Sequence, residues 1–154
     1  MVSSVVDGDT AQLRRAVREL ADRAEITELL ARLGRWLDEK RFDDTRSVFT
    51  EDATGQFPSG SLRGIEALTA QARRHHADFD RTHHVATNIL VDLAGDRATV
   101  RANQIATFVR HTGTLEPDLT VGERYRFEAV RTGQGWRFAR VEVDLLWRST
   151  APER

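Results

Sequence analysis

The spacing of the apolar residues changes partway along the chain, and this change constrains the fold more than any other feature of the sequence. Up to about residue 76 the apolar residues recur every three or four positions, which is the period of an amphipathic helix. From residue 84 onward they alternate with polar residues, which is the period of a half-buried strand. Helices that precede an antiparallel sheet predict the α+β class rather than a wound parallel sheet.

The helical part divides into several segments. Two apolar stripes that are out of phase meet near Asp22, and Asp22 followed by Glu25 resembles a helix-capping sequence. We therefore predict a short helix from about residue 11 and a longer one over 23–39. Two further helices are expected over 43–49 and 65–76, with a loop rich in helix-breaking residues over 58–64.

The alternating part is best explained by two β-hairpins. A tight turn at 94–96 joins a strand over 84–93 to one over 97–110. A second turn at 132–135 joins a strand over 123–131 to one over 136–147. At 154 residues the chain is most simply a single domain. We place this domain at 10–148, between a disordered N-terminus (1–9) and a C-terminal tail (149–154).

The composition argues against several functional classes. The formal net charge is −1 and the two signs are interspersed, so we expect no basic face for nucleic acid. The chain has no cysteine, which excludes disulfides, thiolate nucleophiles and cysteine-based zinc sites. No apolar run approaches the roughly 20 residues of a membrane span, and the N-terminus lacks the pattern of a secretory signal. A cytoplasmic protein that does not bind a membrane is the expectation.

The segment RTHHVATN (81–88) sets two adjacent histidines at the head of a predicted strand. Successive side chains of a strand point to opposite faces, so His84 shares a face with Asn88 while His83 points the other way. A histidine in this place can transfer protons, bind a metal, or be a structural group at the end of a sheet. The residues alone leave these three roles open.

Asp38, at the end of the long predicted helix, is a second candidate. It either faces solvent like its neighbours Glu39 and Lys40, or points inward to orient an imidazole. A metal site that includes His75 and His76 is not favoured, because adjacent helix residues point about 100° apart and no HExxH motif accompanies them. A nucleophilic triad is not favoured either, because GxSxG and cysteine are both absent.

Five segments together give the chain a family resemblance: ADRAEITELLARLGRWLDEKRFDD, VFTEDAT, LRGIEAL, RTHHVATNILVDLAGDRATV and GQGWRFARVEVDLLW. In this order the chain resembles the SnoaL-like branch of the nuclear transport factor 2 superfamily, over about residues 20–147. The resemblance implies a cone-shaped fold in which N-terminal helices pack on a curved antiparallel sheet. Within the superfamily the chain is most similar to the scytalone dehydratase group. An Asp on the long helix and a His in an RTxH stretch form the catalytic pair there, and the matching positions are Asp38 and His84.

The resemblance is incomplete around this pair. The tyrosines that polarise the substrate carbonyl in the dehydratase correspond here to Leu37 and Phe57, and that family's second histidine falls near Phe108. The ketosteroid isomerases of the superfamily carry a general-base Asp where this chain has Phe57, and a tyrosine at about Leu33. The Asp–His pair is thus kept, whereas the surrounding oxyanion donors are not.

The resemblance implies an enzyme of dehydratase, isomerase or cyclase type that needs no cofactor and no metal. Its substrate would be a small hydrophobic oxygenated metabolite, such as a polyketide- or steroid-like ring. His84 would act as base and acid, for which the ordinary imidazole pKa of ~6.5 is suitable, and Asp38 would fix its tautomer. Asn88 is a candidate oxyanion donor, and the expected pocket walls are Trp36, Phe57, Phe108 and Tyr125.

Two alternatives stay open. The same pair would also suit epoxide opening or ring closure, and a ligand-binding protein without chemistry agrees with the missing tyrosines. The position of Asp38 separates these alternatives, since a carboxylate within reach of His84 in a closed pocket favours an enzyme and one in solvent favours a binding module. The resemblance further implies a homodimer or small homo-oligomer, for which the apolar stripe over 141–147 is the candidate surface.

Overall fold

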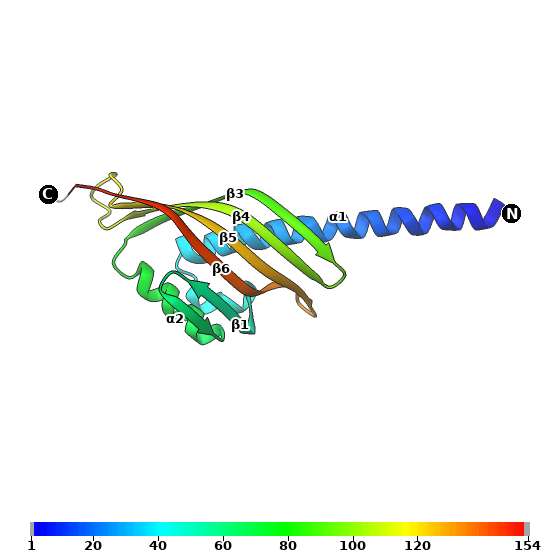
Figure 1. Ribbon diagram of the computed structural model, residues 1–154, viewed down its shortest axis with the longest axis horizontal. Coiled ribbons are helices and arrows are strands. Elements are labelled where there is room, and N and C mark those ends of the chain that lie inside the picture. The colour runs from blue at the N-terminus through cyan, green and yellow to red at the C-terminus, as the bar shows by residue number, and fades with distance from the viewer. Residues whose placement is uncertain (1, 153–154) are drawn as a thin grey trace.

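The computed structural model describes residues 2–152 and consists of a long helix, a short hairpin, a second helix and four long strands (Figure 1). The predicted α+β class is confirmed. The elements in chain order are α1 (Val2–Asp38), η1 (Phe42–Ser47), β1 (Phe49–Phe57), β2 (Gly60–Arg63), α2 (Ile65–His76), β3 (Arg81–Ala94), β4 (Arg97–Val109), β5 (Leu119–Thr132) and β6 (Gly135–Thr150).

The six strands form one curved sheet in the order β2-β1-β6-β5-β4-β3. β1 and β6 run parallel, and all other neighbouring strands are antiparallel. The two predicted hairpins are confirmed as β3–β4 and β5–β6. One face of the sheet packs on α2 and on the C-terminal half of α1, and large side chains from both layers are fully buried between them, among them Ile26, Leu29, Val100, Phe127, Trp136 and Phe138. This arrangement is the cone that the resemblance implies.

α1 is one continuous helix, so the predicted break near Asp22 is wrong. Asp22 does not cap a helix, because its buried carboxylate accepts hydrogen bonds from Arg131 and from the indole of Trp136. The change of phase in the apolar stripe marks the point where the helix enters the core: residues 11–20 are exposed, and Ile26 is fully buried.

The helix also continues back through residues 2–9, where the sequence predicted disorder, since no proline interrupts it. The domain boundaries themselves stay a prediction. Despite the length of α1, no helix in the described part of the chain has an apolar stretch that would cross a membrane.

The region between α1 and α2 differs from the prediction in two places. The helix expected over 43–49 is a short 3-10 turn, η1, and Phe49 already belongs to β1. The expected loop over 58–64 contains β2, which pairs with β1 across a tight connection. Gly60 has a φ of 128°, a conformation that glycine adopts without strain, so the residue that indicated a loop permits a hairpin here.

A β-bulge in β3 changes the faces that the sequence predicted. The register with β4 shifts between Thr87 and Leu90, and Asn88 has a φ of 54°, in the left-handed region that Asn tolerates better than most residues. The inward positions of β3 are therefore 84 and 86 before the bulge, but 89 and 91 after it. Asn88 is exposed and does not share the inner face with His84, which corrects the prediction.

A second register shift corrects the apolar stripe predicted on β6. Glu123 pairs with Leu145 and Gly122 pairs with Trp147, so Leu146 is an extra residue in β6. Val141 and Val143 are buried on the inner face, and only Trp147, beyond the bulge, turns to the outer face. The stripe over 141–147 is therefore not one outer surface.

Candidate active site

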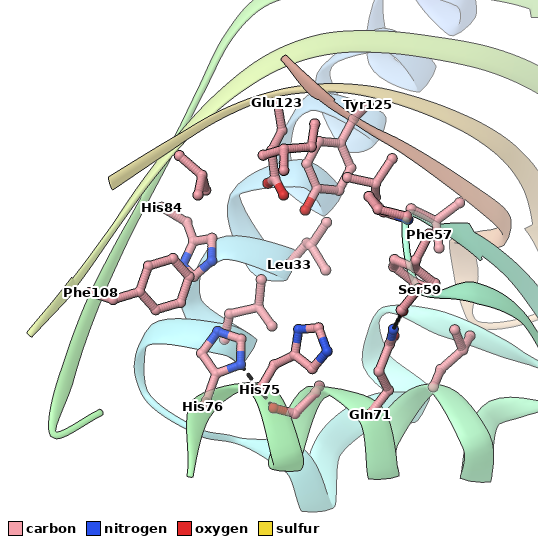
Figure 2. Close-up of a pocket in the computed structure, with 18 of the residues that line it drawn as sticks. Leu33, Phe57, Ser59, Gln71, His75, His76, His84, Phe108, Glu123 and Tyr125 are labelled. Atoms are coloured by element: carbon pink, nitrogen blue, oxygen red, sulfur yellow. Dashed lines mark hydrogen bonds between the residues drawn. The ribbon is translucent and has the colours of Figure 1, made fainter. Parts of the chain in front are cut away.

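A cavity of about 300 Å³ lies between the inner face of the sheet, α2 and the end of α1. Its wall is mostly apolar, with Leu33, Leu37 and Leu68 from the helices and Val121 and Val143 from the sheet. A few polar side chains point into it from different elements (Figure 2). A concave apolar site with a small number of converging polar groups is the usual form of a small-molecule site.

Asp38 and His84 are in direct contact at the end of this cavity. The Asp38 Oδ1 lies 2.6 Å from the His84 Nδ1, and the Asp38 Oδ2 accepts a hydrogen bond of 3.0 Å from the backbone N–H of His84. The Thr82 hydroxyl donates a third hydrogen bond, of 2.9 Å, to Oδ1. The carboxylate is thus held on three sides, by groups that β3 presents at its first inward positions.

This contact fixes the tautomer of His84. Burial by itself raises the pKa of Asp38. This effect is outweighed by the hydrogen bonds from the ring and backbone of His84, by the positive charge of His84 and by the hydrogen bond from the Thr82 hydroxyl, so the pKa of Asp38 lies below its ordinary value. An ionised carboxylate only accepts hydrogen bonds, so the His84 Nδ1 carries a proton, and in the neutral form of the ring the lone pair is on Nε2. The His84 side chain lines the cavity with 4% exposure, while His83 is exposed on the other face, as predicted.

His76, from the last turn of α2, brings a second imidazole to the same cavity. Its ring centroid lies 5.5 Å from that of His84 and 5.7 Å from that of Phe108. Burial lowers the pKa of His76 to about 4, and the positive charges of His84 and His75 act in the same direction, although the hydrogen bond to the Ala72 carbonyl opposes them. His76 is therefore a neutral group at physiological pH.

Glu123 and Tyr125 face the cavity from β5 (Figure 2). Burial raises the pKa of Glu123, against the smaller opposing effects of His84 and of the Tyr125 hydroxyl. Tyr125 in turn accepts a hydrogen bond of 3.1 Å from the Gln104 amide. A carboxyl group with a raised pKa keeps its proton to higher pH, and only in the protonated form does it donate a hydrogen bond.

The structure brings most of the predicted site residues to this cavity. Trp36, Phe57, Phe108 and Tyr125 line it together with His84, and Asp38 lies directly behind His84. Leu33, Leu37, Phe57 and Phe108, which replace polar residues of the related enzymes, are part of the apolar wall. Asn88 is the exception, because the bulge in β3 places it on the surface, away from the cavity. Whether these residues bind a substrate stays a prediction.

His76 and Glu123 are among the polar residues of the cavity that sequence reasoning missed. Glu123 lies two positions before Tyr125, so strand parity would have put it on the same face. His76 follows Ile65, Leu68 and Ala72 at helical spacing on the buried stripe of α2, so it belonged to an inward face rather than to a metal site. Among the side chains that the structure describes, residues 8–152, no three His, Asp or Glu form a group that could hold a metal ion.

The fold is that of the cone-shaped proteins of the nuclear transport factor 2 type, and the cavity lies inside the cone. Residues 18–142 match the family described as the SnoaL-like domain. The chain belongs to this family.

Three similar proteins illustrate the relationship. An uncharacterized protein of Mycobacterium tuberculosis is 32% identical over 129 residues, which cover 81% of this chain and 86% of the relative. The crystal structure of the Kfla4162 protein from Kribbella flavida has a TM-score of 0.78 and 31% identity, and the match covers 85% of this chain and 95% of that one. The structure named "Putative Scytalone Dehydratase" from Novosphingobium aromaticivorans has a TM-score of 0.77 and 21% identity, and the match covers 88% of this chain and 91% of that one. This match shows a likeness of fold alone.

Proposed function

We propose that the protein is an acid–base enzyme of dehydratase, isomerase or cyclase type that uses Asp38 and His84 and needs no cofactor. The observation that carries this proposal is the 2.6 Å contact between Asp38 and the His84 Nδ1, with the rest of the imidazole in the wall of an apolar cavity. A carboxylate behind the histidine fixes its tautomer and stabilises its imidazolium, which favours general-base catalysis, whereas ligand binding alone gives the carboxylate no such task.

In the proposed reaction, the His84 Nε2 removes a proton from the carbon next to a carbonyl group of the substrate. Asp38 stabilises the imidazolium that forms and keeps the ring in position. In a dehydration, His84 then returns the proton to a departing hydroxyl group. Because the wall is largely apolar, the substrate class that fits is a small hydrophobic oxygenated molecule, such as a polyketide- or steroid-like ring.

Two further observations support acid–base chemistry. Burial favours the protonated form of Glu123, and in that form the residue donates a hydrogen bond; its proposed acceptor is the substrate carbonyl, which the related dehydratase binds with tyrosines. The shared fold with a protein whose name carries the words scytalone dehydratase agrees with an elimination reaction, although that likeness extends to the fold only.

The exchange of α-protons of β-tetralone in deuterated buffer tests this proposal without knowledge of the natural substrate. β-Tetralone is a hydrophobic ring ketone, and proton NMR measures the loss of its α-proton signals directly. We expect the wild-type protein to accelerate exchange and His84→Ala to remove most of this acceleration, by about 10²-fold or more. A wild-type rate equal to that of buffer, across β-tetralone and a panel of other ring ketones, would favour the binding-module alternative.

His83→Ala is the matched control. His83 is the adjacent residue of the same strand, but its side chain is exposed on the outer face. The control therefore removes an imidazole from β3 without touching the cavity, and we expect it to leave the exchange rate unchanged. Equal losses in the two variants would show that the effect comes from disturbance of β3 and not from a base.

A further inference from the structure

His76 is held in one orientation by its own helix. Its Nδ1 lies 2.8 Å from the carbonyl oxygen of Ala72, one turn earlier in α2. A carbonyl oxygen only accepts hydrogen bonds, so Nδ1 carries the proton and Nε2 is left with a lone pair. Figure 2 shows the ring with this second nitrogen turned toward His84 and Phe108.

The Nε2 of His76 is an acceptor without a donor. The residue is 5% exposed, and Nε2 is the single buried side-chain nitrogen or oxygen that has no hydrogen-bond partner among the described residues. A buried polar atom without a partner costs free energy, and such atoms in native proteins commonly meet a ligand or a water molecule. Its low pKa, about 4, keeps the ring neutral, so that the lone pair remains available.

His84 provides a second nitrogen in the same corner of the cavity. The two ring centroids are 5.5 Å apart and the ring planes differ by 34°. The His84 Nδ1 is bound to Asp38, which leaves its Nε2 to act on the substrate. Two hydrogen bonds of about 2.8 Å each can connect such a pair of rings through one oxygen atom.

We propose that His76 and His84 together form an oxygen subsite, which binds a hydroxyl group of the substrate and the water molecule formed from it. The hydroxyl donates its hydrogen bond to the His76 Nε2, and its oxygen faces the His84 Nε2. His76 is a binding residue in this scheme, and His84 is the group that transfers the proton. The inference rests on the proposed acid–base function and narrows its substrate to a β-hydroxy ketone.

The elimination balances at this subsite. The His84 Nε2 takes the α-proton, and the electron pair of the broken C–H bond is delocalised onto the carbonyl as an enolate. The enolate then forms the carbon–carbon double bond as the C–O bond breaks, with the bond's electron pair leaving on the hydroxyl oxygen. The proton on His84 joins that oxygen, so the products are an unsaturated ketone and water, and His84 returns to its neutral form. The water now has two hydrogens, one for the Nε2 of each histidine.

A matched pair of ligands tests the subsite by binding rather than by turnover. β-Naphthol carries a hydroxyl donor, and β-methoxynaphthalene has the same ring system without one. We expect the wild-type protein to bind β-naphthol about tenfold more tightly, which is the value of roughly one hydrogen bond. In nitrogen-15 NMR of the histidine-labelled protein, the Nε2 signal of His76 should move upfield with β-naphthol and stay in place with β-methoxynaphthalene.

Variants of His76 complete the test. His76→Phe keeps a flat ring without an acceptor, so this variant should lose the preference for β-naphthol. His76→Gln should keep part of the preference. His83→Phe, which changes a residue outside the cavity, is the control and should keep all of the preference. A preference that survives in His76→Phe, or an Nε2 signal that does not move, overturns the subsite. If β-tetralone exchange still depends on His84 in that case, the proposed function stands; loss of His84-dependent exchange would remove that function instead.

Discussion

Two aspartates of α1 have opposite kinds of partner. Asp22 binds the Arg131 guanidinium through both oxygens at 2.8 Å and also accepts from the Trp136 indole at 3.1 Å. Every partner of this carboxylate is a permanent donor, so the contact can hold the helix to the sheet but cannot exchange a proton. Asp38 binds an imidazole, whose second nitrogen is free and lies at a cavity.

The difference shows which observation separates a structural carboxylate from a functional one. Both aspartates are partly or largely buried and both have a lowered pKa, so neither burial nor the pKa shift distinguishes them. What differs is the chemistry of the partner and the presence of a cavity beside it.

Replacement of Asp38 should abolish most proton transfer. Without the carboxylate His84 loses both its fixed tautomer and the stabilisation of its imidazolium, so Asp38→Asn should slow β-tetralone exchange by about 10²–10⁴-fold. The double variant with His84→Ala should be little worse than either single one, since groups that act as a unit are strongly non-additive. An Asp38→Asn rate within a factor of a few of the wild-type rate would show that His84 works without Asp38.

Acid should weaken the fold through His76. Its folded-state pKa is about 4 and its ordinary value is 6.5, so between these pH values the unfolded chain binds a proton that the folded protein does not. The free energy of unfolding should therefore fall as the pH is lowered through this window, by up to about 3 kcal/mol from this residue.

Urea denaturation at a series of pH values gives the free energy of unfolding of the wild type and of His76→Phe, and the difference between the two measures the contribution of His76. The difference is needed because Glu123, with its raised pKa, acts in the opposite direction at the acidic end of the window. We expect the pH dependence of the variant to be flatter between about pH 6.5 and 4. Parallel curves for the two proteins would show that His76 is not protonated on unfolding in this range.

Replacement of Asp22 should cost stability and leave the chemistry unchanged. Asp22→Asn removes the charge that Arg131 and Trp136 share, and because the Arg131 side chain is 34% exposed we expect a loss of only about 2 kcal/mol in the free energy of unfolding. β-Tetralone exchange should keep its wild-type rate at a temperature where the variant is folded. A fall in that rate comparable with the effect of Asp38→Asn would remove the distinction between the two aspartates.

The smallest effect on exchange is expected on the outer face of the sheet. Val85, Ile105 and Trp147 are exposed there in one row, since Val85 pairs with Ile105, and both Ile105 and Trp147 pair with Gly122. We propose this row as the contact between two copies of the chain, in place of the stripe over 141–147. Trp147→Asp should then lower the mass measured by light scattering and leave the exchange rate unchanged, and a wild-type monomer at micromolar concentration would count against the dimer.

The periodic parts of the chain were predictable because local spacing decides them. The two hairpins and α2 follow from period and turn residues, and the side on which His84 lies follows from strand parity near the start of β3. Parity fails once a bulge intervenes, since one extra residue reverses every later position. Asn88 and Trp147 were misplaced for this reason, and neither bulge has a signal in the alternation of apolar residues.

The sequence by itself therefore determined the class of fold, the two hairpins, α2 and, with the family resemblance, the pairing of Asp38 with His84. Only the tertiary structure decided that α1 runs unbroken past Asp22, that Arg131 is the partner of Asp22, and that His76 and Glu123 face the same cavity. The physical reason is distance along the chain. Helix and strand periods are set by neighbours a few residues apart, whereas Asp22 and Arg131 are 109 residues apart, and such contacts form only when separate elements pack.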